Sequence, residues 1–425
     1  MESHFNYISR NFLAKWSKIM KMFHKSLVAG ALLAFAAFGS ASADELKFEN
    51  KVETDTVYIG NLGHDDTPYE RTKDYNRFPG ITETMKMEYT SEKVDAKAEL
   101  QFWLFGYNED EFNLATLEDE KCTFVGLNGF SFGETYIKFR PIEILEIALR
   151  AREKAAGSYL PVLDDNVSLG NYTGDFGLLV KPIEGLSIGA GINFLSYIIN
   201  DYDFYNDPDK IYLNFGAEYE LENIGSFALT FNNVINEFGF GAFAKINAIN
   251  ALDIYGGFSY QKESAYLALK HFTPHYYPST SGMRAWNNYY VEGNIILNAA
   301  AEYKGIDKLT LAAELATNCG TVKDNETAFD LYTGLKAEYE INDAFSVSGT
   351  SYMSFDFADS RNEDNLNYCL SPLISFYPEV AYKLGNNTFK AGFKMEFWQS
   401  YEIDKDTDRK TQFTAAIPLS WTYAF

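Results

Sequence analysis

The residues best suited to chemistry are few and widely scattered. Beyond residue 43 the chain has three histidines, His64, His271 and His275. His271 and His275 have the spacing at which two imidazoles on one face of a helix bind a metal. Pro274 lies between them in a segment rich in turn-forming residues, where a helix is not expected. We therefore do not expect His271 and His275 to bind a metal.

The acidic clusters also lack the partners that chemistry would require. Asp404, Asp406 and Asp408 alternate like the first ligands of a calcium loop. The glycine expected at the sixth position and the glutamate expected at the twelfth are both missing. The chain has one adjacent His64-Asp65-Asp66 trio, but no G-x-S-x-G nucleophile and no glycine-rich phosphate loop. We therefore predict no catalytic, cofactor-binding or metal-binding residues, no cofactor, and a protein that is not an enzyme.

Cysteine content and charge exclude further classes of protein. Cys122, Cys319 and Cys369 have neither C-x-x-C nor zinc-site spacing. Their odd number permits either one disulfide with one free thiol or three free thiols. The 36 basic and 59 acidic residues give a net charge of −23, which repels nucleic acid. We therefore expect no nucleic-acid partner.

The N-terminus has the three parts of a secretory signal peptide. Lys18, Lys21 and Lys25 precede an apolar run at residues 26–40, and Ala41-Ser42-Ala43 follows it. We predict cleavage between Ala43 and Asp44, recognised through Ala41 and Ala43. The chain then divides into a signal peptide, residues 1–43, and a mature domain, residues 44–425. Met20 or Met22 would start a signal of ordinary length. Removal of residues 1–43 leaves 31 basic and 58 acidic residues, a net charge of −27.

Residues of the mature chain alternate between apolar and polar with period two. Every second residue from Phe413 to Phe425 is apolar, and those between are mostly small or polar. This period is that of a β-strand with one apolar face. The same alternation occurs at 94–104, 210–221, 291–303, 329–341 and 389–401. We therefore predict an all-β fold, with no apolar stretch long enough for a membrane helix.

The connections alternate between short turns and long loops, which is typical of a membrane β-barrel. The predicted short turns are 91–93, 141–143, 182–185, 222–225, 248–251, 305–308, 342–344 and 385–387. Counting gives a single antiparallel transmembrane barrel of about 18 strands, with about 16 as the alternative. The doubtful region is 252–272, which holds either one long strand or two strands with a turn near Glu263. The strands of a soluble β-sandwich, which is the alternative fold, also alternate between apolar and polar residues. The length of the strands and the aromatic residues at the C-terminus favour the barrel.

The chain ends on Trp421-Thr-Tyr423-Ala-Phe425. This end resembles the C-terminal assembly signal of Gram-negative-type outer-membrane proteins. Residues 44–425 as a whole resemble the general porins and other large single-chain barrels, as an architecture and not as one family. The resemblance implies the outer membrane of a diderm bacterium, contact with outer-membrane lipid and insertion by the barrel-assembly machinery that reads Trp421, Tyr423 and Phe425. A homo-oligomer is compatible with it.

The polar side chains opposite the apolar rows should line a hydrated lumen. The candidate pore-lining residues are Lys86, Glu88, Lys97, Glu99, Arg150, Arg152, Glu218, Glu220, Lys336, Glu338, Lys390, Lys394 and Glu396. We predict a porin-like channel for passive diffusion of small hydrophilic solutes. Acidic loops predict a mild preference for cations. The apolar, glycine-rich loop at 106–131 is the expected constriction.

Two other functions remain open from sequence. A surface adhesin or receptor would act through the acidic, tyrosine-rich loops. A transporter for hydrophobic solutes would need an N-terminal hatch inside the barrel, and the alternation beginning near Leu46 leaves little chain for one.

Overall fold

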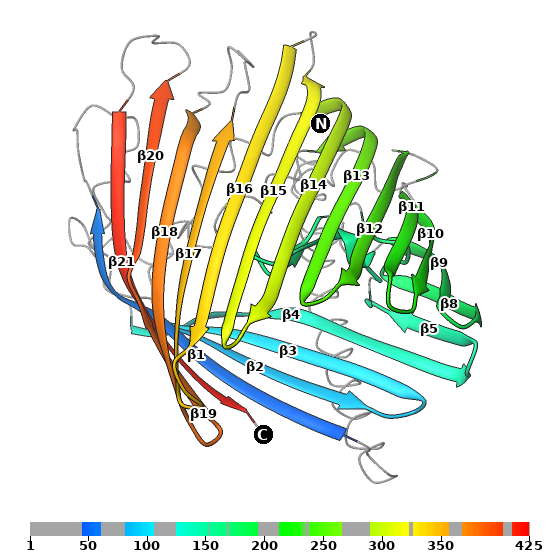
Figure 1. The fold of residues 1–425 in the computed structure, drawn as a ribbon, viewed down its shortest axis with the longest axis horizontal. Coiled ribbons are helices and arrows are strands. Elements are labelled where there is room, and N and C mark those ends of the chain that lie inside the picture. Colours follow the sequence, from blue (N-terminus) through cyan, green and yellow to red (C-terminus); the bar gives the residue numbers. More distant parts are fainter. Residues whose placement is uncertain are drawn as a thin grey trace, which may run out of the picture.

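The computed structural model describes residues 45–60, 81–105, 125–151, 153–167, 170–193, 212–232, 234, 238–265, 290–322, 326–356, 368–402 and 410–424. Nearly all of them lie in one antiparallel sheet that closes on itself (Figure 1). Its first strands are β1 (Glu45–Gly60), β2 (Ile81–Thr90), β3 (Val94–Phe105), β4 (Val125–Ile142), β5 (Leu145–Leu149), β8 (Phe176–Ile183), β9 (Leu186–Asn193), β10 (Tyr212–Leu221) and β11 (Gly225–Asn232). It continues through β12 (Gly239–Ile249), β13 (Leu252–Ala265), β14 (Tyr290–Ile306), β15 (Leu309–Val322), β16 (Glu326–Glu340), β17 (Phe345–Asp356), β18 (Tyr368–Leu384), β19 (Asn387–Gly392), β20 (Lys394–Glu402) and β21 (Lys410–Ala424).

The first and last strands close the barrel. β1 pairs with β2 on one side and with β21 on the other. β19 and β20 form one strand of the wall, interrupted at Phe393, because both pair with β18 and both pair with β21. The barrel therefore has 18 strands. The prediction of about 18 is confirmed, and residues 252–265 form a single strand between β12 and β14.

All the short turns predicted from sequence connect neighbouring strands, some of them a residue or two from the predicted place. Several have residues with positive φ, including Gly185, Asn223, Ala251, Lys308 and Gly385. Since the strands simply run up and down, these turns lie at one rim and the longer connections at the other. This is the arrangement of a transmembrane barrel.

The wall has two chemically different faces. Along β11 the side chains of Phe227, Leu229 and Phe231 are exposed, whereas Ala228 and Thr230 are buried. Large exposed apolar side chains occupy every second position on most strands of the ring, as at Leu297, Leu335, Val380 and Phe389. These rows point outward. No helix in the described part of the chain is long and apolar enough to cross a membrane.

Pro418 lies in the strand that closes the barrel. It is paired with Asp55 of β1, and the next pair is Ala416 with Tyr58, so β1 contains a bulge at this point. Proline cannot donate a ladder hydrogen bond, and a bulge is where the ladder is already interrupted. The bulge explains how a proline is accommodated between two neighbouring strands.

Candidate functional site

The connection between β5 and β8, residues 150–175, folds into the barrel and is called here the inward loop. It forms a tongue whose two limbs pair with each other. The amide of Arg150 donates to Asp175 O at 2.5 Å, and that of Ala155 donates to Gly170 O at 2.6 Å. Further out lie a 3-10 turn, η2 (Ala156–Ser158), and a two-stranded hairpin, β6 (Tyr159–Leu160) with β7 (Asp165–Asn166).

The inward loop lies along the inner face of the barrel, within the ring of strands (Figure 1). η2 packs against β11, β12 and β13, and β6 packs against β14. Wall side chains hold its backbone. Asn214 donates from Nδ2 to Thr173 O at 2.9 Å, Asn298 donates from Nδ2 to Gly157 O at 3.1 Å, and Glu218 Oε1 accepts from the Ala156 amide at 3.1 Å. The loop therefore covers the inner wall from β8 to β16.

The tip of the inward loop is bound to the far wall by one carboxylate. Glu314 of β15 accepts hydrogen bonds from the amides of Val162 at 2.5 Å and Leu163 at 3.0 Å. It also accepts one from the hydroxyl of Tyr332, on β16, at 2.7 Å. Both Glu314 and Tyr332 are buried. A buried carboxylate needs such donors, because its charge is costly to remove from water without them.

An apolar cluster lies beneath the hairpin. Leu160 and Val167 of the inward loop pack with wall residues Tyr255, Ile296 and Tyr332. Tyr159 meets Tyr255 edge to face, with ring centroids 5.4 Å apart. Burial raises the pKa of Tyr159 above its ordinary value, and its hydrogen bond to Asp164 raises it further. The hairpin is thus docked by apolar burial as well as by Glu314.

Glycines on the inner face make room for the inward loop. A Cβ at Gly216 of β10 would overlap the side chain of Tyr172, and one at Gly189 of β9 would lie 2.5 Å from Tyr172 O. A Cβ at Gly334 of β16 would lie 3.0 Å from Val162 Cγ1. Only residues without a side chain permit such close approach of the loop to the wall.

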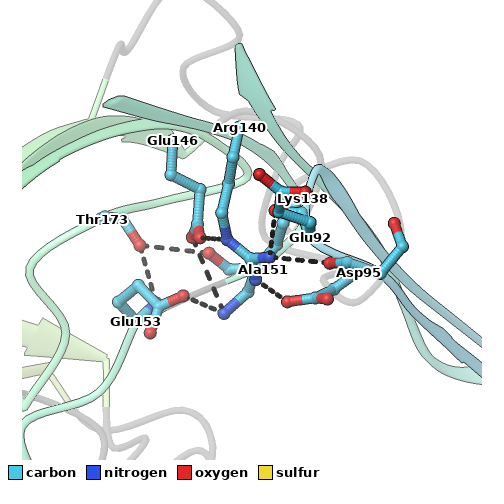
Figure 2. A network of polar contacts seen from close by, with 9 residues as sticks. Glu92, Asp95, Lys138, Arg140, Glu146, Ala151, Glu153 and Thr173 are labelled. Atoms are coloured by element: carbon cyan, nitrogen blue, oxygen red, sulfur yellow. Dashed lines mark hydrogen bonds and ion pairs between the residues drawn. The ribbon is translucent and has the colours of Figure 1, made fainter. Parts of the chain in front are cut away.

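Arg140 of β4 organises the base of the inward loop (Figure 2). Its guanidinium donates from Nε to Glu146 at 2.9 Å and is paired through Nη2 with Asp95. Nη1 donates to the carbonyls of Ser91 and Glu92 at 3.2 and 3.3 Å. One planar cation thereby joins β3, β4, β5 and the turn before β3, which is a geometry that lysine cannot reproduce.

Lys138 continues this network into the loop itself (Figure 2). Its ammonium is paired with Glu153 of the inward loop and lies 3.9 Å from Glu146. The Glu153 amide donates to the Thr173 hydroxyl at 2.7 Å, and that hydroxyl donates to Ala151 O at 3.1 Å. The loop therefore starts from a fixed, charge-paired base.

The remaining inner wall carries charged side chains. Lys86 lies 3.3 Å from Glu49, and Lys97 is paired with Glu88 and Glu134. Across the barrel, Lys336 lies 3.7 Å from Glu338, and Lys390 lies 3.0 Å from Glu379. Strand register places these groups on the face opposite the exposed apolar rows. The inner wall is thus divided into a part covered by the loop and a charged part.

The inner and outer surfaces together decide the class of this protein. An apolar outer ring suits acyl chains, and charged inner side chains need water. The chain is a membrane-spanning β-barrel of porin-like architecture. No family model matches the sequence. A comparison with curated proteins finds no match either.

Solved structures with a similar fold are bacterial outer-membrane channels. The outer membrane channel DcaP of Acinetobacter baumannii has a TM-score of 0.46 and 8% identity, covering 90% of this chain and 96% of that one. A BenF-like porin from Pseudomonas fluorescens Pf-5 has a TM-score of 0.48 and 11% identity, covering 89% and 98%. An anion-selective porin from Comamonas acidovorans has a TM-score of 0.42 and 10% identity, covering 90% and 99%. At these identities and scores, the function of the porin-like barrel has to be inferred from the barrel itself.

The predicted pore-lining residues do not form one group. Lys86, Glu88, Lys97, Lys336, Glu338 and Lys390 lie in the charged part of the wall, and register places Glu99 and Lys394 on the same face. The backbone of Glu396 lies in β20, paired with Thr414 of β21. Glu218 binds the inward loop, and Glu220 lies two residues along the same strand. Arg150 is the first residue of the loop and has positive φ.

Several predicted residues lie outside the part of the chain that the structure describes. They are Arg152, Ala41, Ala43, Asp44, Phe425, His64, His271, His275, Cys122 and the three aspartates at 404, 406 and 408. Cys319 is a free thiol. Trp421 and Tyr423 lie in β21, where they pair with β1 and β19.

The C-terminal bound of the predicted constriction loop was wrong, because residues 125–131 of the proposed 106–131 loop belong to strand β4. Residues 106–124 lie outside the described residues, so their role as a constriction stays a prediction. Within the described residues, the connection that folds inward is 150–175. A sequence signal for it exists, since the inner positions of β8 to β10 include Gly177, Gly189, Gly191 and Gly216, where other strands carry charged residues. Sequence reasoning also missed Glu314, which stands between Ala312 and Ala316 on the inner face.

Proposed function

We propose that this porin-like barrel is a channel through which small hydrophilic solutes diffuse passively. The observation that carries the proposal is the charged inner wall of β1–β3 and β17–β19, together with Lys336 and Glu338 of β16, outside the part that the inward loop covers. Charged groups at this position require water, because drying them would cost several kcal/mol for each ion. A closed barrel of this strand number is wide enough to hold that water beside a folded loop.

A mild preference for cations is part of the proposal. On β1 to β5 and the loop base, the paired carboxylates of Glu45, Glu49, Glu53, Glu88, Asp95, Glu134, Glu146 and Glu153 outnumber the cations of Lys47, Lys51, Lys86, Lys97, Lys138 and Arg140. The mature chain as a whole would have a net charge of −27. A negative lining concentrates cations and repels anions.

Planar-bilayer recording tests both parts of the proposal. The refolded mature protein should give ohmic single-channel steps, and liposomes containing it should swell in small sugars. Absence of both would contradict a channel. Under a salt gradient the reversal potential should have the sign of cation preference, and the preference should weaken as salt screens the lining. A reversal potential of the opposite sign would contradict the charge argument alone.

The route to the membrane also belongs to the proposal. Residues 1–43 would direct export and be removed after Ala43. The barrel-assembly machinery would then insert the chain through its last strand, which carries Trp421, Tyr423 and Phe425. N-terminal sequencing of protein purified from outer membranes tests the cleavage site.

A further inference from the structure

Glu314 links the tip of the inward loop to the opposite wall through both of its carboxylate oxygens. Oε2 accepts from the amide of Val162, and Oε1 accepts from the amide of Leu163 and from the hydroxyl of Tyr332. Only 4% of Glu314 is exposed. Two consecutive amides at the turn of a hairpin therefore meet one carboxylate, and a charged acceptor makes such bonds stronger than neutral ones.

The wall around Glu314 is shaped to receive the tip. Its inner-face neighbours on β15 are Ala312 and Ala316, and Gly334 faces it from β16. A Cβ at Gly334 would lie 3.0 Å from both Glu314 Cγ and Val162 Cγ1, which is shorter than an ordinary van der Waals contact. Larger side chains at these positions would hold the tip away from the carboxylate.

The other polar anchors of the inward loop lie nearer its base. Asn298 holds Gly157, Glu218 holds Ala156, and Lys138 is paired with Glu153. The hairpin beyond η2 is held by Glu314 and by the apolar cluster around Leu160. Release of the carboxylate would therefore leave the tip held by the apolar cluster alone, and more weakly, while the base stays in place.

We propose that Glu314 is a positioning residue that sets the open width of the channel by holding the loop tip against β15. This inference rests on the proposed channel function. With the tip docked, the charged wall faces open water. With the tip released, the hairpin swings toward that wall and narrows the path for solutes, so each undocking is a brief partial closure.

Bilayer recording of Glu314→Gln tests the proposal. The amide has nearly the same shape, but its NH2 group faces donors and cannot accept from them. Loss of charge-assisted hydrogen bonds should shift the docking equilibrium at least about tenfold, so brief partial closures should become about tenfold more frequent. Glu302→Gln is the matched control. It removes the same charge from the inner face of β14, where Glu302 is paired with Lys304, and it should leave the closures at the wild-type frequency.

The outcomes separate the two proposals. If the wild-type protein conducts and Glu314→Gln closes no more often than Glu302→Gln, the positioning role is wrong and the channel stands. If the wild-type protein does not conduct, both proposals fall. Should Glu314→Gln not fold, Tyr332→Phe removes one of the three donors and should give an intermediate closure frequency. Wild-type behaviour of that variant would overturn the positioning role.

A cross-link tests whether tip position alone is responsible. In a Glu314→Ala protein without native cysteines, Val162→Cys and Gly334→Cys place two thiols close enough to bond. Oxidation with copper phenanthroline should restore the wild-type closure frequency, and reduction should remove the rescue. Closures that persist in the oxidised protein would contradict the proposal.

Discussion

At the scale of single residues, the contact between the inward loop and the wall depends on missing side chains. Gly216 is one such case, because a Cβ there would overlap Tyr172 and lie 2.6 Å from Leu229 O. The backbone of Leu229 on one side and the buried side chain of Tyr172 on the other leave no room for an added methyl group. The glycine is therefore required by packing and not by chain flexibility.

Gly216→Ala should lower the free energy of unfolding by about 1–3 kcal/mol, the usual cost of overpacking. Urea unfolding of the refolded protein in detergent measures the change. Gly349→Ala on β17 is the control, because a Cβ there meets nothing within 4 Å. Equal stability of the two variants would show that Tyr172 is not packed as described.

Tyr172 also makes the barrel sensitive to alkaline pH. Burial raises the pKa of Tyr172 above its ordinary value, and the carboxylates of Glu218 and Glu153 raise it further. The unfolded chain loses this proton near pH ~10, whereas the folded chain keeps it. The folded state then binds more protons, so the free energy of unfolding decreases as the pH rises above about 10.

Tyr172→Phe should reduce this alkaline loss of stability, because phenylalanine has no proton to retain. Urea midpoints at pH about 9 and about 11 measure the loss in each protein. Tyr339→Phe, on the outer face of β16, is the control and should keep the wild-type difference. An unchanged pH difference in Tyr172→Phe would contradict the burial of that hydroxyl.

At the scale of elements, the inward loop is a separable unit. The hydrogen bond from Ala155 to Gly170 brings its two limbs together close to the base. Replacing residues 156–169 by a short glycine linker should therefore leave the base network intact and widen the water path. Single-channel conductance should rise, and larger sugars should pass in liposome swelling. An unchanged size limit would mean that the narrowest point lies elsewhere.

The elements that cross the membrane were predictable, and the inward loop was not. A strand of the wall has one face in lipid, so its residues must alternate, and the rim turns must contain residues that tolerate positive φ. The apolar and polar residues of the inward loop do not alternate, because the loop is surrounded by protein on most sides and has no lipid-facing side. In the sequence, Glu314 cannot be distinguished from the other carboxylates of the inner face. Its role becomes visible only when the loop tip that binds it is located. Only the inner glycines of β8 to β10 indicated where a loop would pack.

At the scale of the whole molecule, the barrel depends on the pairing of β1 with β21. Deletion of residues 421–425 removes the partners of Asn50 and Val52 on β1. Backbone groups left unpaired in lipid cost several kcal/mol each, so the truncated chain should not close. Loss of the heat-modifiable folded band on SDS gels would show this. Trp421→Phe, which removes one hydrogen bond to Asn387, should still give that band.

The wall is not equally tall around the ring. β14 has 17 residues, whereas β8 has 8 and β5 has 5. Eight tilted residues rise only about 20 Å, less than the apolar band of about 25 Å in barrels of this type. Acyl chains beside Phe176 and Leu178 of β8 must therefore shorten or disorder, while those beside β14 stay extended. The protein should consequently refold in higher yield in short-chain than in long-chain lipid vesicles, and it should thin the leaflets on one flank only.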